Sequence, residues 1–519
     1  MRATRVLRLP HAPAVATAAA VTAGSPRGPR RASIISPLVM GDAAVHVVST
    51  DEQDRRGVLI ELRLDAGARP ATVRRGFLRL FADVFGTGGP PQPVSVGRHY
   101  MRCALTPNEI TRLVRGGDPA TAAGAQRALE LIYHVWPDLI LRAHLDRSVS
   151  TIKSDAALRT FGSAGAGVVW GVLDSGIDAS HPHFAAHDTL TAPAVSKLHR
   201  DFTTPSSPDA KPSPLTDAYG HGTHVAGIIA GQAPSDTKAL RIAHNQPTAQ
   251  DLPQWALRTL PEGATLSGVA PKANLVSLKV LDDNGNTLSS VVIQAIEYIR
   301  NVNDVGRGLQ LHGVNLSLGC PWPPGEYAAG QSPLCRELDL LTGTGVIVVV
   351  SAGNEGAGGT LEGPSGDVHG QLSTITDPGN AATAITVGSV HRYRPHTFGV
   401  TFNSSKGPTL DGRLKPDLVA PGECITSAGT GQLIAGVPPL APAAGDPSQV
   451  ARYIQDSGTS MSAAHVSGAI AGFLSVRREY VGQPESVKKL FRDSAIDLGR
   501  HEFYQGAGLI DLMRALSDT

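Results

Sequence analysis

The stretch VVWGVLDSGID, residues 168–178, is a continuous apolar run that ends in a carboxylate followed by a glycine turn. Strands that are buried on both faces of a sheet have this continuous apolar character. Four further runs of the same kind follow along the chain: ANLVSLKVL (273–281), GVNLSLG (313–319), GVIVVVSAG (345–353) and AITVGSV (384–390). Helical patterns fall between and after them, at about 222–231, 288–301, 334–343, 461–478 and 485–494. This alternation predicts an α/β fold whose mostly parallel sheet carries helices on both faces.

Three segments place chemically useful side chains at a strand end or a helix start, where ligand sites of such sheets lie. The first run ends at Asp174, GHGTHVAG (220–227) sets His221 between glycines, and SGTSMSAAHV (457–466) sets Ser460 before an apolar helix. Taken singly, each residue also fits a turn, a helix start or an N-cap. Together they supply the groups of nucleophilic catalysis, since a serine hydroxyl needs an imidazole to accept its proton and a carboxylate to orient that imidazole.

A fourth segment, VVVSAGNEG (348–356), ends a buried strand with Asn354. A side-chain amide can stabilise the negative charge that develops on a scissile carbonyl oxygen. The backbone N–H groups and the positive dipole end at the start of the Ser460 helix favour the same charge. An asparagine in a glycine turn is the alternative interpretation.

The order Asp174, His221, Asn354, Ser460 and the motifs DSGID, GHGTHVAG, SAGNEG and GTSM resemble the subtilisin-like serine proteases, or subtilases (peptidase S8). The resemblance extends over roughly residues 148–515 and implies a three-layer subtilisin-like fold. It also implies that Asp174, His221 and Ser460 form a catalytic triad and that Asn354 joins the Ser460 N–H in an oxyanion hole. The substrate-binding positions that it implies are Ser317, Leu318, Gly319, Ala352 and Gly353.

The resemblance implies a serine endopeptidase that cleaves polypeptide substrates through an acyl-enzyme and needs no cofactor for catalysis. Structural calcium is frequent in subtilases, and the turn 282–285 (DDNG) offers oxygen ligands, with an ordinary turn as the alternative. The pairs His221/His224 and His181/His183 lack a zinc motif, so no metal ligand is predicted. Subtilases commonly carry proline where this chain has alanine at position 464, which suits a helix and predicts retained activity.

The amino-terminal part has a different pattern. Residues 1–40 are rich in arginine and alanine and contain no acidic residue, which predicts a disordered tail. In residues 41–147, strand patterns at 57–64, 99–106 and 132–145 and helical patterns at 71–85 and after a capping box at 106–109 predict a small α+β domain with two helices. Residues 148–519 form the predicted peptidase domain.

The α+β domain is similar in size, pattern and position to the inhibitory propeptide of subtilases. The similarity implies a zymogen that is cut near Leu145 to Ser150 and inhibited by its own N-terminal region. The alternative is a pseudoprotease or binding module in which residues 57–147 permanently occupy the substrate site.

Composition excludes several classes of partner. The chain has 46 Lys and Arg against 45 Asp and Glu, so a net charge of +1 creates no long-range field toward nucleic acid. No run approaches the roughly 18 apolar residues that a membrane span needs.

The four cysteines are predicted to differ in their surroundings. Cys103 and Cys424 are predicted as small buried residues. Cys320 and Cys335 bracket one loop, either as free thiols or as a disulfide. The segment 232–266 is predicted as an inserted loop with a short helix, or alternatively as a partner surface.

Overall fold

The chain forms two units, residues 1–141 and residues 142–519. The predicted boundary after residue 147 falls six residues later than this division (147 − 141). The computed structural model describes residues 34–35, 55–64, 69–96, 99–117, 122–137, 147–203, 213–234, 240–247, 253–260, 265–321, 328–358, 369–435, 437 and 452–518.

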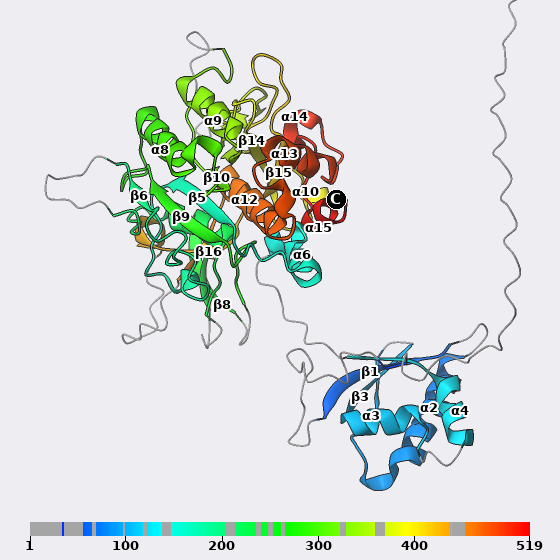
Figure 1. Cartoon of the computed structure of the whole chain (residues 1–519). Coiled ribbons are helices and arrows are strands. Elements are labelled where there is room, and N and C mark those ends of the chain that lie inside the picture. The colour runs from blue at the N-terminus through cyan, green and yellow to red at the C-terminus, as the bar shows by residue number, and fades with distance from the viewer. Residues whose placement is uncertain are drawn as a thin grey trace, which may run out of the picture. The chain divides into compact units, whose positions relative to one another are not determined.

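The first unit is an antiparallel sheet of order β2-β3-β1-β4 with helices on one face (Figure 1). Its strands are β1 (Arg56–Leu62), β2 (Val94–Val96), β3 (Tyr100–Leu105) and β4 (Ile132–Pro137), and its helices are α2 (Pro70–Phe85), α3 (Pro107–Val114) and α4 (Ala122–Leu131). The predicted number of two helices is therefore wrong, because α4 has few large apolar residues and no strong apolar stripe. The end of the predicted strand 132–145 lies outside the described residues.

Helix α3 begins with the predicted capping box. The Glu109 N–H donates to Thr106 Oγ1 at 3.2 Å, and the Thr106 N–H donates to Glu109 Oε2 at 2.8 Å.

Two residues of the predicted tail, Ile34 and Ile35, are part of the first unit. The Val135 N–H donates to the Ile34 carbonyl, and Ile34 joins the core of this unit. The other residues of the predicted tail lie outside the described residues.

The second unit is built on a parallel sheet of order β15-β14-β11-β10-β5-β9-β6. The strands are β5 (Val169–Asp174), β6 (Arg200–Asp201), β9 (Asn274–Lys279), β10 (Gly313–Leu316), β11 (Ile347–Ser351), β14 (Ile385–His391) and β15 (Leu418–Glu423). The five strands predicted from continuous apolar runs are confirmed as β5, β9, β10, β11 and β14.

Helices cover both faces of this sheet, which confirms the three-layer α/β fold (Figure 1). Trp170 and Val349 point into one core, and Leu173 and Val348 point into the other, as strand alternation requires. The first core contains α6 (Ser154–Phe161), α7 (His221–Ile229), α12 (Thr459–Val476), α13 (Pro484–Asp493) and α15 (Leu512–Ser517). The second contains α8 (Ser289–Val302) and α9 (Pro333–Gly343). Short helices complete the unit: α5 (Arg147–Thr151), α10 (Pro395–Phe398), α11 (Gly431–Ala435) and α14 (Glu502–Gln505).

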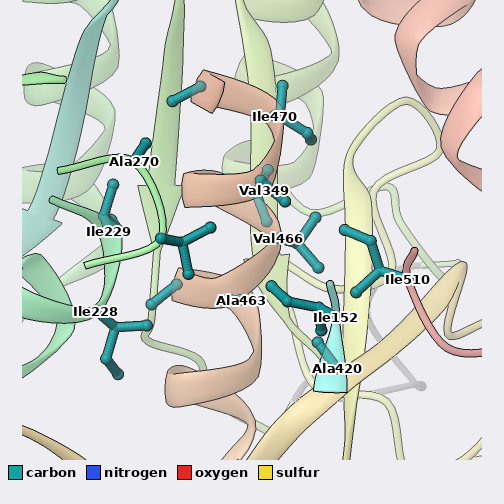
Figure 2. Packing of buried hydrophobic residues seen from close by; sticks show 14 of the residues in the cluster. Ile152, Ile228, Ile229, Ala270, Val349, Ala420, Ala463, Val466, Ile470 and Ile510 are labelled. Carbon is teal, nitrogen blue, oxygen red and sulfur yellow. The ribbon is translucent and has the colours of Figure 1, made fainter. Parts of the chain in front are cut away.

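Helix α12 lies at the centre of the first core. Figure 2 shows Val466 and Ile470 of α12 near Val349 of β11. A helix with apolar residues on all sides is stable only when it is enclosed in this way. Ala464 is fully buried within the continuous helix.

A second sheet of order β16-β17-β7-β8 uses part of the inserted segment. Its strands are β7 (Arg241–Pro247), β8 (Pro253–Thr259), β16 (Ile425–Ala428) and β17 (Tyr453–Asp456). Among its described residues, the insertion 232–266 thus supplies a hairpin and not the predicted short helix, because β7 adds to β17 in parallel and Ile242 packs beside Tyr453. Strands β12 (Ala357–Gly358) and β13 (His369–Gly370) form a separate two-stranded sheet.

The four cysteines are free. Cys103 is buried as predicted, but Cys424 is exposed, because it lies in the turn between β15 and β16. Cys320 and Cys335, both described residues, form no disulfide with each other. Cys335 lies on α9, where its thiol is buried and contacts the Pro378 carbonyl, and Cys320 is exposed. Within the described ranges, no helix combines the length and the apolar character that a membrane crossing requires.

Candidate active site

Asp174 ends strand β5 and is fully buried. Its Oδ1 atom accepts a hydrogen bond from the Ser175 N–H at 2.8 Å and lies 2.8 Å from Nδ1 of His221. The structure therefore joins the first two predicted catalytic residues through one carboxylate oxygen. In this arrangement His221 Nδ1 carries the proton, which leaves Nε2 as the basic atom.

His221 is the first residue of α7, and two residues that the sequence analysis missed hold this helix start. Asp217 accepts from the Gly220 N–H at 2.7 Å and from the Thr223 N–H at 2.8 Å. Ser175 Oγ accepts from the Gly222 N–H at 2.9 Å. The N-cap of α7 is Gly220, so Asp217 lies three residues before the position at which a capping residue is read from sequence, and no standard capping signal identifies it.

Glycine at position 222 allows α7 to approach β5 closely. A Cβ atom there would lie 2.2 Å from the Gly176 carbonyl oxygen and 3.1 Å from Asp174 Cβ. Any side chain would push the helix away from the carboxylate. Only glycine at position 222 lets α7 come close enough to β5 for His221 to reach Asp174.

The protonation of His221 is set by opposing effects. Burial lowers the pKa of His221, but the charge of Asp174 and the hydrogen bond to it outweigh burial, with Asp456 and Asp217 adding to them, and the pKa is raised to about 9. The imidazolium form is thus stabilised, which a base that becomes protonated during the reaction requires.

We expect kcat/KM for a chromogenic peptide to rise with pH and to reach half its maximum between pH 6.5, the ordinary histidine value, and about pH 9. Protonated His221 cannot accept the serine proton, and a raised pKa extends the protonated form to higher pH. Activity measured from about pH 5 to about pH 11 checks this expectation. A profile already at its plateau at pH 6.5 would contradict it.

Ser460 lies in the first turn of α12. Its hydroxyl donates to the Ser317 carbonyl at 3.3 Å, and the Ser317 hydroxyl donates to the Ser460 carbonyl at 3.0 Å. In the described part of the chain, no hydrogen bond joins Ser460 to His221. His221 nevertheless lines the same cavity as Ser317, the hydrogen-bond partner of Ser460.

A buried polar chain fixes β10 to α12, the helix that carries Ser460. Asn315 Nδ2 donates to Ser317 Oγ at 2.8 Å, and Ser467 Oγ donates to Asn315 Oδ1 at 2.9 Å. No local sequence signal points to Asn315 or Ser467, because their hydrogen bond joins residues that are 152 positions apart.

Asn354 follows β11 and is exposed. Its Oδ1 atom accepts from the Thr459 N–H at 3.0 Å and from the Thr459 hydroxyl at 3.2 Å. Thr459 Oγ1 in turn accepts from the Gly353 N–H at 3.2 Å. Because the amide oxygen is engaged next to Ser460, the Nδ2 donor remains for a ligand oxygen beside that serine.

The predicted substrate-binding residues fall into two groups. Ser317, Leu318 and Gly319 line a cavity of about 330 Å³, whose apolar wall includes Leu281, Val292 and Leu334. Ala352 is fully buried and Gly353 is half-buried, and neither residue lines this cavity. The two groups meet at Thr376, whose Oγ1 lies 2.8 Å from an ideal Cβ on Gly319 and 2.6 Å from one on Gly353.

The turn at 282–285 uses its carboxylates internally. Asp282 Oδ1 accepts from the Asn284 and Asn286 N–H groups, each at 2.9 Å, and Asp283 accepts from Lys279 Nζ at 3.0 Å. Among the described residues, no group of three or more His, Cys, Asp or Glu side chains could hold a metal ion.

Residues 165–508 match the Subtilase family. The chain is 29% identical to Subtilisin E of Bacillus subtilis (strain 168) over 368 residues, which are 71% of this chain and 70% of that protein. It is also 29% identical to Subtilisin of Bacillus pumilus over 368 residues, covering 97% of that protein. Pyrolysin of Pyrococcus furiosus is 30% identical over 339 residues, covering 58% of this chain and 21% of that protein.

Proposed function

Because the chain belongs to the subtilase family of serine proteases, we propose that it is an endopeptidase that uses Asp174, His221 and Ser460 as its triad. The observation that carries the proposal is the 2.8 Å contact between His221 Nδ1 and the buried carboxylate of Asp174. His221 also lines the same cavity as Ser317, and the Ser317 carbonyl accepts a hydrogen bond from the Ser460 hydroxyl. Substrates are polypeptides, bound along Ser317, Leu318 and Gly319.

The proposed reaction begins with rotation of the Ser460 hydroxyl from the Ser317 carbonyl toward His221 Nε2. The oxygen attacks the scissile carbonyl while Nε2 takes the proton, and Asp174 stabilises the resulting imidazolium. Asn354 Nδ2 and the Ser460 N–H donate to the carbonyl oxygen as it becomes negative. The imidazolium then protonates the leaving amine, and a water molecule hydrolyses the acyl-enzyme by the same route. This chemistry uses no cofactor, and structural calcium stays a prediction.

A fluorophosphonate probe tests the proposal, because it reacts only with an activated serine. Native protein is expected to form one covalent adduct, which peptide mapping by mass spectrometry locates on Ser460. Heat-unfolded protein serves as the control and is expected to remain unlabelled. An adduct on another serine, or no adduct, contradicts the triad and favours the pseudoprotease alternative.

We further propose that the first unit is a propeptide that inhibits the second and is removed. It has its own antiparallel sheet and core, as an independently folded inhibitor needs. Ser148 is fully buried and its hydroxyl lies 2.8 Å from Nε2 of His465 in α12, so the chain is packed into the second unit from this point on. A cut on the N-terminal side of Ser148 would leave this packing intact.

Expression of the full chain is expected to yield a product smaller by about 15 kDa, the share of the 54.0 kDa chain that residues 1–147 represent. Intact-mass measurement checks this, and Ser460→Ala should keep the full mass because the cut is made by the active site. Full-length protein that still reacts with the probe would refute the cleavage but not the protease assignment.

A further inference from the structure

The loop that carries Asn354 is clamped on both sides by a distant segment, residues 402–406. The Ser405 N–H donates to the Gly353 carbonyl at 2.9 Å, and Ser405 Oγ accepts from the Glu355 N–H at 3.0 Å. The Gly356 N–H donates to the Asn403 carbonyl at 2.9 Å. Hydrogen bonds therefore fix the backbone before and after the asparagine.

The ammonium of Lys406 completes this clamp. Lys406 is 3% exposed, and its Nζ donates to the carbonyls of Gly356 at 2.7 Å, Phe402 at 2.9 Å and Ser404 at 3.0 Å. An ammonium group has three donors and no acceptor, so these carbonyls satisfy it completely. The same group lies 5.5 Å from the centre of the Tyr504 ring, within the range of a cation–π contact.

This charge is held without a carboxylate. In the described ranges, no acidic side chain forms an ion pair with Lys406, and burial lowers its pKa. Burying a charge costs free energy unless the charge is paired or hydrogen-bonded. The hydrogen bonds to the carbonyl oxygens therefore offset the cost of burying the Lys406 ammonium. Without the ammonium, the Phe402 and Ser404 carbonyls would lose this donor, and the Gly356 carbonyl would keep only the Gln371 N–H, which donates to it at 2.9 Å.

Glycine at position 356 allows this approach. A Cβ atom on Gly356 would lie 1.8 Å from the Ser404 carbonyl oxygen and 2.4 Å from Lys406 Nζ. The two backbones can converge on the ammonium only because this residue has no side chain.

We infer that Lys406 is a positioning residue for catalysis: its ammonium gathers three backbone carbonyls and thereby holds the Asn354 loop so that Nδ2 faces the developing oxyanion. The inference rests on the proposed function. Lys406 touches neither substrate nor Ser460 in this scheme and acts through Asn354 alone.

The variant Lys406→Met tests the inference, because methionine fills similar space and removes the charge and its donors. We expect kcat on a peptide substrate to fall by about tenfold or more while KM stays within about threefold, since the lost contact acts in the transition state. Lys488→Met is the control for the loss of a buried lysine. Lys488 is also nearly buried and donates to the Ala382 and Ala384 carbonyls, each at 2.9 Å. Unlike Lys406 it forms an ion pair with Asp417 at 3.2 Å, and all three partners lie outside the Asn354 loop. Its kcat is expected to stay within about twofold of wild type even where the melting temperature falls.

A double-mutant cycle separates positioning from general damage. Asn354→Ala alone should lower kcat by about 10²- to 10³-fold, the loss known for the corresponding donor in subtilisin. In that background Lys406→Met should lower kcat by less than about twofold, because its target is already gone. The same loss from Lys406→Met in both backgrounds overturns the inference.

A second variant covers misfolding. If Lys406→Met does not fold, Ser405→Ala takes its place in the cycle, since it removes only the hydroxyl that accepts from the Glu355 N–H. The same non-additivity with Asn354→Ala is expected, and additive losses count against the clamp. Wild-type protein without activity or probe labelling would refute the proposed function itself, whereas active wild type with additive losses would refute only the role of Lys406.

Discussion

Ser460→Ala is expected to lower kcat by about 10⁶-fold, the size of the loss known for the nucleophile of subtilisin. The substitution removes the oxygen that is proposed to form the acyl-enzyme, while Asn354 and the start of α12 remain. It also removes one hydrogen bond of 3.3 Å to the Ser317 carbonyl, which is a small change for the fold. Residual hydrolysis of a peptide substrate and labelling by the fluorophosphonate probe are the measurements.

Ser462→Ala is the matched control for this variant. Ser462 lies two residues further along α12, is fully buried, and donates to the Ala420 carbonyl at 3.0 Å, away from the reacting atoms. Its variant should keep both labelling and kcat within about threefold of wild type. Equal activity of Ser460→Ala and wild type would show that the chemistry resides elsewhere.

Asp174→Asn is expected to lower kcat by about 10⁴-fold, the loss known for the same change in trypsin. A carboxylate oxygen can only accept from His221 Nδ1, whereas an amide can present its own N–H and stabilise the tautomer with the proton on Nε2. That tautomer cannot accept the Ser460 proton. The neutral amide also no longer raises the pKa of His221, so the residual activity should reach its half-maximum at lower pH than in wild type.

Asp178→Asn controls for the loss of an aspartate in the same motif. Asp178 Oδ1 accepts from the Ser180 N–H at 2.9 Å, and Oδ2 accepts from the Thr430 hydroxyl at 2.8 Å. None of these partners is proposed to take part in catalysis, so kcat should change by less than about threefold. A shift of the pH profile in Asp178→Asn as large as in Asp174→Asn would contradict the assignment of Asp174.

The central layers of the peptidase unit could be predicted because their signals are local. A strand such as β11 is buried on both faces and has an apolar residue at nearly every position. The start of α3 is likewise encoded by four consecutive residues, 106–109. Both kinds of signal depend on the chain's own neighbours.

The hairpin β7–β8 could not be predicted for the opposite reason. Ile242 and Ala243 are its consecutive buried residues, so the alternation of apolar and polar residues that marks a strand is missing. β7 pairs with its neighbour β8, and the hairpin joins the sheet through β17, which pairs with β7 across 211 residues (454 − 243, for the pair Ile454 and Ala243). A local pattern cannot encode such a partner.

Residues that support the candidate site were missed for a related reason. Asp174 and Ser460 were predicted because their motifs are distinctive. The contacts that link Lys406 to the Asn354 loop and Asn315 to α12 instead span long stretches of sequence, 50 residues to Gly356 and 152 residues to Ser467. Three of the partners of Lys406 are backbone carbonyls, which carry no sequence signature at all. Such contacts become visible only when the chain is folded.

The order of strands in the central sheet also has a consequence for how fast this protein can fold. Gly313 of β10 pairs with Trp170 of β5 across 143 residues (313 − 170), and Asn274 of β9 pairs with Val169 across 105 (274 − 169). The entropy of closing such long loops is lost before the pairing energy is gained, which makes parallel sheets slow to form. At a given equilibrium stability, a protein that folds slowly also unfolds slowly. The lifetime of the native state is therefore governed by the height of the unfolding barrier as well as by the free energy of unfolding.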